Sequence, residues 1–355
     1  MRAPEDHEGF ELLSEDPGEV RRAFLERGWG DGLPIVAPTA ERVDEMLGTG
    51  PKDPDELVGI IPPRLGQATR RLIAVNAVMA GCTPELFPVV CTAVSALCRP
   101  EVNLAGAQAT TGPVAPLSII HGEAVERLGF NCGHGTFGPG WVPNASVGRA
   151  VKLVLLNVGG ARSGDASMTT LGQPGQYGMC IAENTPESPW ESYPASLGLD
   201  AASAITVYLS ESVHNAQDHS SDRPAGVLQS IASMAAAHGS NATYASDAES
   251  FIVMCPEHAG LAASEGWTRQ DVQLYLYEHA RLTRQRLSLG GCAGMDSWRP
   301  WMHADDAPEQ RLPVVNHPDQ FRILVAGGAG KHSTVVTSWG PTQSVTVPLE
   351  LEQES

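Results

Sequence analysis

The apolar residues of this chain form short runs typical of strands and longer segments with helical spacing. Four runs of five or six residues predict strands at 116–120, 204–209, 251–255 and 321–326. Around them, apolar residues at helical spacing predict helices at 17–27, 40–47, 67–80, 84–98, 145–158, 223–238, 259–265 and 269–287. Because strands alternate with helices, the pattern predicts an α/β fold with a mixed or mainly parallel sheet flanked by helices.

The same pattern divides the chain into three segments. Residues 1–66 form an N-terminal segment of helices and loops, residues 67–195 an Ala/Gly-rich α/β half, and residues 196–355 a half of βαβ type. The Gly/Pro-rich N-terminal half ends in a polar stretch, 161–195, that lacks strand or helix periodicity. A stretch of this length inside a compact domain is typical of a functional loop or an arm.

Composition and net charge indicate which class of protein this is and which partners are not expected. The chain is 42% hydrophobic and 18% charged, which is typical of a globular protein. Its net charge of −18 repels phosphate backbones, so we expect no nucleic-acid partner. Apolar runs are too short to span a membrane, and the acidic N-terminus does not resemble a signal peptide. The seven cysteines have no CxxC spacing, so we expect reduced thiols in a cytoplasmic protein.

A histidine follows each predicted strand within a few residues. These histidines are His121, His214, His258 and His332. In α/β sheets, ligands bind beyond the carboxyl ends of the strands. If the four strands run parallel in one sheet, the imidazoles gather at one rim and form an active site. The alternative is that each histidine is separately a capping or surface residue.

The segment after the last predicted strand is rich in glycine. Gly327, Gly328 and Gly330 allow backbone N–H groups to turn toward one point, and Lys331 and Ser333 add a positive charge and a hydroxyl. This combination predicts an anion-binding loop for phosphate, sulfate or carboxylate. Its spacing departs from a P-loop, so we do not expect ATP. The alternative is a tight surface turn with a solvated Lys331.

Two cysteines are candidate nucleophiles. Cys132 lies two residues before His134 in a glycine-dense stretch. The two residues could form a nucleophile–base pair or serve as two metal ligands, and His134 is also a candidate substrate contact. Cys292 lies in a second glycine-rich segment, where a reactive thiol is partly exposed. The alternatives are that the glycines around Cys132 only allow the chain to pack closely against another element and that Cys292 is a small turn residue.

Carboxylates and an amide extend the candidate site. Glu257 lies beside His258 at a strand end, and the two form a candidate acid/base pair in which His214 also moves protons. Glu183 and Asn184, in the long polar stretch, are expected to close over the substrate.

A divalent metal is an alternative use of the same histidines. The candidate ligands are His214, Asp218, His219 and His258, since zinc needs three or more ligands of this kind. No Gly-x-Gly-x-x-Gly sequence opens a helix after a strand, so we expect neither NAD nor FAD.

Taken whole, the chain resembles an uncharacterised bacterial family. The resemblance covers nearly the full length, and its main segments are Asp31-Gly-Leu-Pro-Ile-Val-Ala-Pro-Thr39, Asn76-Ala-Val-Met-Ala-Gly-Cys82, Phe137-Gly-Pro-Gly140 and Gly327-Gly-Ala-Gly-Lys-His-Ser333. Some relatives are linked to a separate domain with a Sec-Gly-Ser-Cys motif, similar to the selenoprotein component of glycine reductase, and this chain lacks that motif. The resemblance implies a cytoplasmic enzyme of small-molecule metabolism and assigns no catalytic residue.

These features favour a small-molecule enzyme of lyase, isomerase or hydrolase type, with a lyase or hydrolase preferred. It would act on an anionic metabolite by histidine acid/base catalysis at strand ends. The alternatives are a metal-dependent enzyme with the same histidines, a thiol enzyme that uses Cys132 or Cys292, and a non-catalytic subunit of a multi-component complex. The acidic surface and the apolar helices at 67–98 also predict a homo-oligomer.

Overall fold

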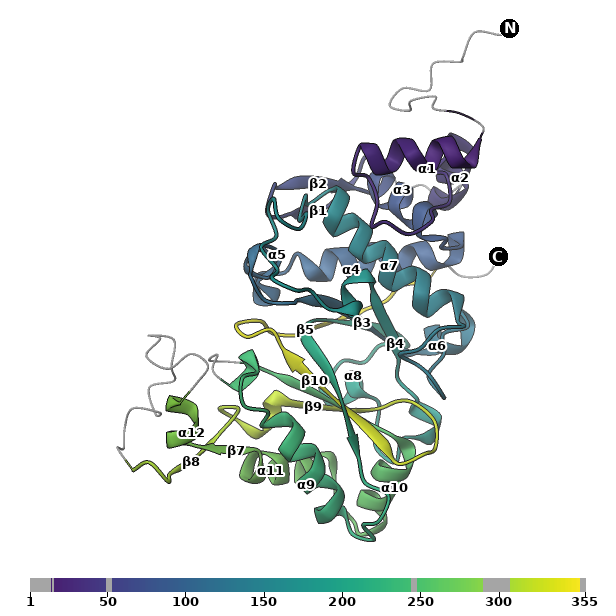
Figure 1. The fold of residues 1–355 in the computed structure, drawn as a ribbon. Coiled ribbons are helices and arrows are strands. Elements are labelled where there is room, and N and C mark those ends of the chain that lie inside the picture. The colour runs from purple at the N-terminus through teal and green to yellow at the C-terminus, as the bar shows by residue number, and fades with distance from the viewer. Residues whose placement is uncertain (1–13, 15, 49–52, 244–247, 290–306, 352–355) are drawn as a thin grey trace, which may run out of the picture.

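The computed structural model describes residues 14, 16–48, 53–243, 248–289 and 307–351 (Figure 1). The strands are β1 (Leu57–Ile61), β2 (Gly66–Thr69), β3 (Ala115–Gly122), β4 (Met179–Ala182), β5 (Ser203–Gln217), β6 (Ser250–Met254), β7 (Arg281–Thr283), β8 (Arg311–Pro313), β9 (Phe321–Val325), β10 (His332–Ser338) and β11 (Val345–Pro348). The α-helices are α1 (Pro17–Glu26), α2 (Ala40–Leu47), α3 (Arg70–Ala80), α4 (Phe87–Leu97), α5 (Leu104–Ala109), α6 (Glu123–Arg127), α7 (Val142–Asn157), α8 (Tyr193–Ser196), α9 (Pro224–Ala235), α10 (Pro256–Ser264), α11 (Arg269–His279) and α12 (Arg284–Ser288).

A mixed sheet forms the centre of the molecule. Its strands lie in the order β4-β3-β5-β10-β6-β9, and β11 pairs with the first half of β5. The β3–β4 and β6–β9 pairs are parallel, whereas β5 is antiparallel to β3 and β10, and β10 is antiparallel to β6. The predicted α/β fold with a mixed sheet is therefore confirmed.

Helices join the strands of each parallel pair. The chain passes from β6 through α10 and α11 to its neighbour β9, so the C-terminal half contains the expected βαβ unit. A second unit runs from β3 through α6 and α7 to β4. Since β3 and β5 are neighbours in one sheet, the sheet continues across the boundary predicted near residues 195–196.

The core has three parts. One lies between the sheet and α3, α4 and α7, and a second lies between the sheet and α9, α10 and α11 (Figure 1). The third contains side chains of β3, β4, β5, β6 and β9, among them Leu117, Ile181, Tyr208, Phe251 and Leu324. Strands at both ends of the sheet order thus share one apolar cluster, because the sheet curls.

The apolar helices at 67–98 are buried within the chain itself. Residues of α3 and α4 such as Ile73, Ala77, Val90 and Val94 belong to the first core. Their apolar character therefore needs no second copy of the chain to cover it, so these helices do not support the predicted homo-oligomer. None of the helices in the described ranges is long and apolar enough to cross a membrane.

Most predicted helices are confirmed, and the main differences concern strands. The polar stretch 161–195 contains β4 and α8, and β5 continues eight residues beyond the predicted end at 209. The predicted helix 269–287 ends at His279, and its remainder forms β7 and α12. Residues 332–338, for which the sequence pattern gave no strand, form β10 in the interior of the sheet.

His121 does not join the other histidines at a common rim. β3 runs antiparallel to β5, so His121 pairs with Ala204 at the start of β5, whereas His214 pairs with Val335 farther along. The single rim of four histidines required parallel strands, and that expectation is wrong for His121.

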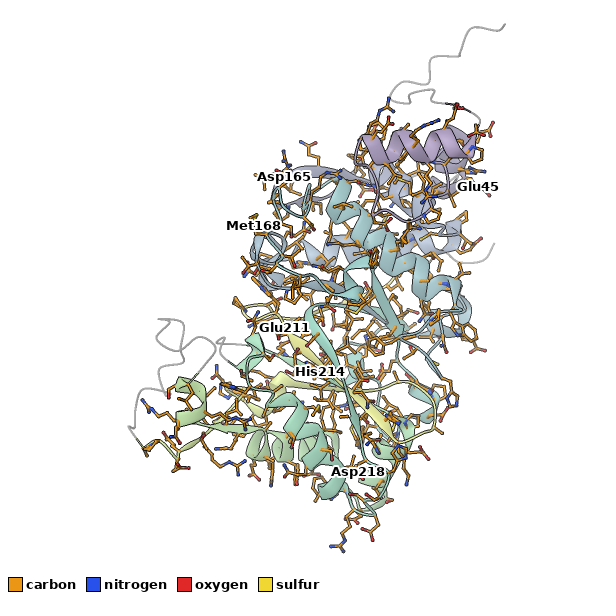
Figure 2. All side chains as sticks on the ribbon, viewed as in Figure 1. Glu45, Asp165, Met168, Glu211, His214 and Asp218 are labelled. Atoms are coloured by element: carbon orange, nitrogen blue, oxygen red, sulfur yellow. The ribbon has the colours of Figure 1, made fainter. Side chains whose placement is uncertain are left out.

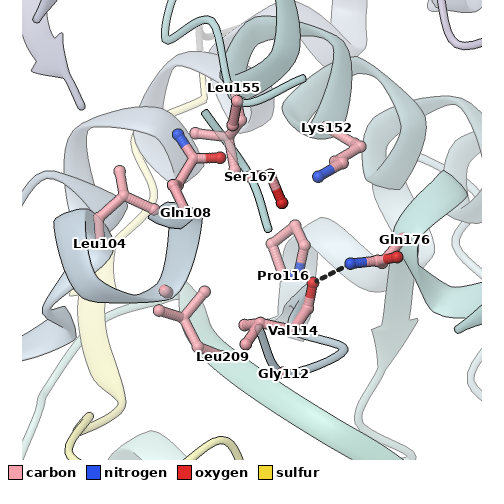
Figure 3. Close-up of a pocket in the computed structure, with 12 residues that line it drawn as sticks. Leu104, Gln108, Gly112, Val114, Pro116, Lys152, Leu155, Ser167, Gln176 and Leu209 are labelled. Atoms are coloured by element: carbon pink, nitrogen blue, oxygen red, sulfur yellow. Dashed lines mark hydrogen bonds between the residues drawn. The ribbon is translucent and has the colours of Figure 1, made fainter. Parts of the chain in front are cut away.

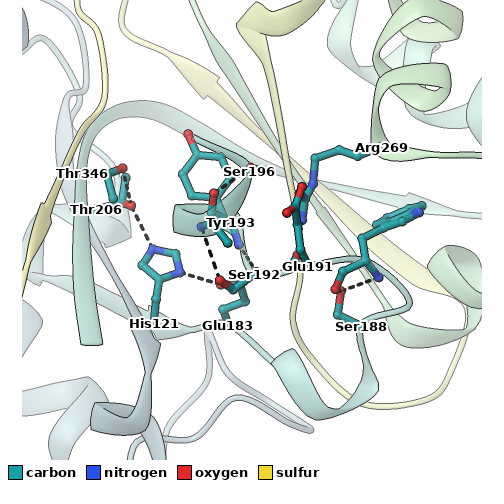
Figure 4. Close-up of polar contacts among 12 residues, drawn as sticks. His121, Glu183, Ser188, Glu191, Ser192, Tyr193, Ser196, Thr206, Arg269 and Thr346 are labelled. Carbon is teal, nitrogen blue, oxygen red and sulfur yellow. Dashed lines mark hydrogen bonds and ion pairs between the residues drawn. The ribbon is translucent and has the colours of Figure 1, made fainter. Parts of the chain in front are cut away.

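His121 instead forms a buried polar network (Figure 4). Its Nδ1 lies 2.7 Å from Oε2 of Glu183, and its Nε2 lies 2.8 Å from Oγ1 of Thr206. The other carboxylate oxygen of Glu183 accepts the backbone N–H of Tyr193 at 2.8 Å, and the Tyr193 ring stacks on His121. His121 and Glu183 are 0% and 1% exposed. The expectation that Glu183 closes over a substrate is therefore wrong, because both of its oxygens bind within the core.

We predict that Glu183→Ala strongly destabilises the fold. The change leaves a buried imidazole without its partner, and breaking a buried pair in this way costs about 3–5 kcal/mol. Urea unfolding monitored by circular dichroism measures the loss. Glu126→Ala, on the exposed surface of α6, is the control and should change stability by less than about 0.5 kcal/mol. Equal stability of the two variants would contradict a structural role for Glu183.

Candidate active site

Side chains of three elements meet where β6 ends. Cys255 follows the last residue of β6 and is the N-cap residue of α10, and His258 lies in the first turn of that helix. Pro256, at the first helical position, has the fixed φ that favours a helix start. Ser333 is the second residue of β10, the strand next to β6.

Ser333 connects the other two side chains. Its Oγ lies 2.8 Å from Nδ1 of His258 and 3.8 Å from Sγ of Cys255, and it accepts the backbone N–H of Cys255 at 3.1 Å. The three residues are buried, with exposed fractions of 1% for Ser333, 2% for Cys255 and 3% for His258. They form one hydrogen-bonded group in the interior.

The hydrogen bond of Nε2 determines which ring nitrogen of His258 can accept a proton. Nε2 lies 3.1 Å from the backbone carbonyl oxygen of Asp218. A carbonyl oxygen only accepts hydrogen bonds, so Nε2 carries a hydrogen in both protonation states of the ring. The proton-accepting nitrogen of the neutral ring is therefore Nδ1, which faces Ser333 and Cys255.

The surroundings favour charge separation between the thiol and the imidazole. Burial raises the pKa of Cys255, but the hydrogen bonds and positive charge of His258 lower it more, and the net shift is downward. Burial lowers the pKa of His258, but its hydrogen bond to Cys255 and the thiolate charge raise it more. In the thiolate–imidazolium form, Ser333 accepts from Cys255 N–H and His258 Nδ1–H and donates to Sγ, which uses its full hydrogen-bonding capacity.

Cys255 was not among the candidates chosen from the sequence. The signal that could have found it is the spacing Cys255-x-x-His258 at the start of a helix, since a thiol at an N-cap lies close to residues in the first turn. By contrast, burial raises the pKa of Cys132, and the charge of Glu187 raises it further. The described structure therefore favours Cys255 over Cys132 as a nucleophile. Cys292 lies outside the described residues.

Glu257 holds the glycine-rich loop and is not placed for proton transfer. Its carboxylate accepts the backbone N–H groups of Gly330 and Lys331, the latter at 2.8 Å. The bond from Gly330 is the main reason that the pKa of Glu257 lies below its usual range. Glu257 is therefore a carboxylate that fixes the loop to α10, and it occupies two of the donors predicted to hold a substrate anion.

The other end of this loop contacts Cys132, His134 and Asn184. Gly327 N–H donates to the carbonyl oxygen of Cys132 at 2.8 Å, and the Asn184 side-chain amide donates to the Gly327 carbonyl at 3.1 Å. A Cβ on Gly328 would lie only 2.4 Å from the His134 ring, so this position requires glycine. The structure thus brings these predicted residues to the loop, although they contact its backbone.

Asn184 also connects the two ends of the sheet order. Its backbone N–H donates to the carbonyl oxygen of Val325, the last residue of β9, at 2.8 Å, although Asn184 follows β4 closely in sequence. This bond holds the glycine-rich loop beside the β4 end of the curled sheet.

Lys331, His332 and His219 form an outer group. Nζ of Lys331 donates to the backbone carbonyl of His219 at 3.2 Å, and Nε2 of His219 lies 3.2 Å from Nε2 of His332. Asn215 Oδ1 lies 2.9 Å from Nδ1 of His332 and orients the ring. His214 stays apart: it lies partway along β5 (Figure 2), and its Nε2 bonds to Ser212.

The four proposed metal ligands do not converge. The Asp218 carboxylate accepts hydrogen bonds from Ser220 and Ser221, and His258 faces inward. Of these four, His219 does face another histidine: its Nε2 lies at a distance from Nε2 of His332 that a shared ion would allow. In the described part of the chain, no group of three or more His, Cys, Asp or Glu side chains has the arrangement of a metal site.

Comparisons with known proteins add nothing to this geometry, since no protein-family model, curated protein or solved structure matches the chain.

We predict that iodoacetamide alkylates Cys255 about tenfold faster than Cys132 at neutral pH. The thiolate is the nucleophile, and only Cys255 of this pair has a lowered pKa. Cys132 is the internal control because it is the more exposed of the two. Peptide mass spectrometry after timed quenching measures both rates. Faster alkylation of Cys132 would contradict the prediction, because exposure and not thiolate character would then govern the rate. As a control, His258→Gln should slow the alkylation of Cys255 to the rate of Cys132 or below.

Proposed function

We propose that the protein is an enzyme of small-molecule metabolism in which the Cys255 thiolate attacks a small anionic substrate and His258 moves the proton. The observation that carries the proposal is the fixed orientation of His258. The Asp218 carbonyl binds Nε2, so Nδ1 is the base, and it faces the Ser333 hydroxyl and the Cys255 thiol. Nucleophilic catalysis by cysteine requires such a base within hydrogen-bond reach.

The proposed step begins with proton transfer. The thiol proton of Cys255 passes through the Ser333 hydroxyl to Nδ1 of His258, and the thiolate adds to a carbonyl carbon of the substrate. The bond to the leaving group then breaks, and the leaving group takes the proton from His258. Water, deprotonated by His258, attacks the thioester and releases the acid and the thiol. This sequence is a hydrolase reaction, with Cys255 and His258 as catalytic residues and Ser333 as a positioning residue that relays the proton.

Substrate access involves the loop from Gly327 to Lys331. Ala329 and Gly330 in this loop are exposed, whereas Cys255 is 2% exposed. Glu257 fixes this loop to α10 next to His258, and we propose that displacement of the loop admits the substrate. The ammonium of Lys331 on the same loop supplies a positive charge for the anionic group of the substrate.

The low exposure of Cys255 favours one second candidate, which is acid/base catalysis without a covalent bond. In that reaction, of lyase type, His258 abstracts and returns a substrate proton through Ser333, and Cys255 only raises the basicity of the imidazole. The two candidates differ in whether an adduct forms on sulfur.

A monoanionic activated ester, 4-nitrophenyl hydrogen succinate, tests the proposal. We predict a burst of one equivalent of 4-nitrophenolate and a succinyl adduct on the Cys255 peptide. Cys255→Ala should abolish the burst, and His258→Gln should slow it by about 100-fold or more, a typical contribution of a general base. Cys132→Ala is the matched control and should keep the burst. Acylation that is spread over several residues, or that persists without Cys255, would overturn the covalent proposal.

A further inference from the structure

A recess lies among α5, α7 and the strands β3 and β5 (Figure 3). Its volume is about 340 Å³ with the open mouth included. The lining residues are Leu104, Ala107, Gln108, Gly112, Val114, Pro116, Lys152, Leu155, Ala161, Ser167, Gln176 and Leu209. None of the residues of the candidate active site is among them.

Lys152 of α7 points its ammonium into this recess (Figure 3). The residue keeps some exposure, and desolvation by the surrounding protein lowers the pKa of its amino group. No other described residue that lines the recess is charged. No described carboxylate pairs with the ammonium, and a desolvated charge without a counter-ion is costly. The missing element is an anion.

Further polar atoms converge on the same space. The Gln108 amide nitrogen donates to Pro62 and the Gln176 amide nitrogen donates to Val114, so both side chains are held in place. The Ser167 hydroxyl and the Gln108 carbonyl oxygen face the interior of the recess near Lys152 (Figure 3). The recess therefore offers an ammonium and a hydroxyl as donors beside one acceptor.

We propose that this recess binds a short-chain monocarboxylate. The Lys152 ammonium and the Ser167 hydroxyl would each hold one carboxylate oxygen, and charge-assisted bonds of this kind are the strong ones. The apolar wall formed by Leu104, Leu155 and Leu209 suits a short alkyl chain. An imine between Lys152 and an aldehyde is the competing chemistry, but it needs an acid or base that the described lining does not supply.

Isothermal titration of the full-length chain with sodium propionate tests the site. We expect binding of propionate, no binding of the neutral isostere propionamide, and at least about tenfold weaker binding of propionate to Lys152→Met, which removes a charge-assisted bond. Ser167→Ala should weaken binding severalfold and covers the case in which Lys152→Met fails to fold. Arg21→Gln, an exposed change on α1, removes the same charge elsewhere and should bind as the wild type.

A ligand-free stability measurement provides a second readout. At a pH below the lowered pKa of Lys152, the folded state carries a desolvated charge that destabilises it. The free energy of unfolding of the wild type therefore rises as the pH increases from that lowered pKa to the ordinary lysine pKa near 10.4. Lys152→Met should therefore raise the melting temperature at neutral pH by about 2 °C or more, and the gain should shrink at alkaline pH. The proposal would be overturned if Lys152→Met bound propionate as tightly as the wild type does, or if the wild type bound propionamide as tightly as propionate. It would also be overturned if borohydride trapped a propionaldehyde adduct on Lys152 while propionate did not bind.

Discussion

The arrangement of the molecule depends on the position of β10 between β5 and β6. Residues 332–338 pair with β5 on one side, and residues 334–337 pair with β6 on the other. The first half of β5 belongs to the helical core of the N-terminal half, whereas Ala216 near its end lies with β6 and β10 in the core of the C-terminal half, so the β5–β10–β6 pairing joins the two. The same register places Ser333 against Cys255 and His258. The candidate site thus follows from one strand pairing.

Burial gives this small polar group its chemical character. Desolvation alone would keep Cys255 as a neutral thiol and His258 as a neutral imidazole. The directed hydrogen bonds reverse both tendencies, because the low dielectric of the interior strengthens the attraction between the two charges. The same low dielectric raises the free-energy cost of leaving either charge unpaired. Such a group is stable only when every donor and acceptor has a partner. The bonds from Ser333 and from the Asp218 carbonyl supply those partners.

Local sequence signals predicted the helices and the buried strands well. The side chains of Asp16 and Thr39 cap α1 and α2, and β3, β6 and β9 match their apolar runs to within two residues. β10 escaped prediction because it begins with His-Ser-Thr directly after a glycine-rich loop, and its central position depends on pairing with residues about 80 to 130 positions earlier. His258 was recognised from its place after a strand, whereas its partner Cys255 looked like a core residue at the strand end. Glu183 looked like a loop residue because β4 is short and lies among glycines and prolines.

The most direct test of the account is a pH titration of thiolate absorbance at 240 nm in the native protein. We predict one absorbance step below the ordinary cysteine pKa of about 8.5. The step should disappear in Cys255→Ala and move to higher pH in Ser333→Ala, while Cys132→Ala leaves it in place. A titration in which no thiol ionises below about pH 8.5, or in which the early step persists without Cys255, would contradict a thiolate–imidazolium pair at the end of β6.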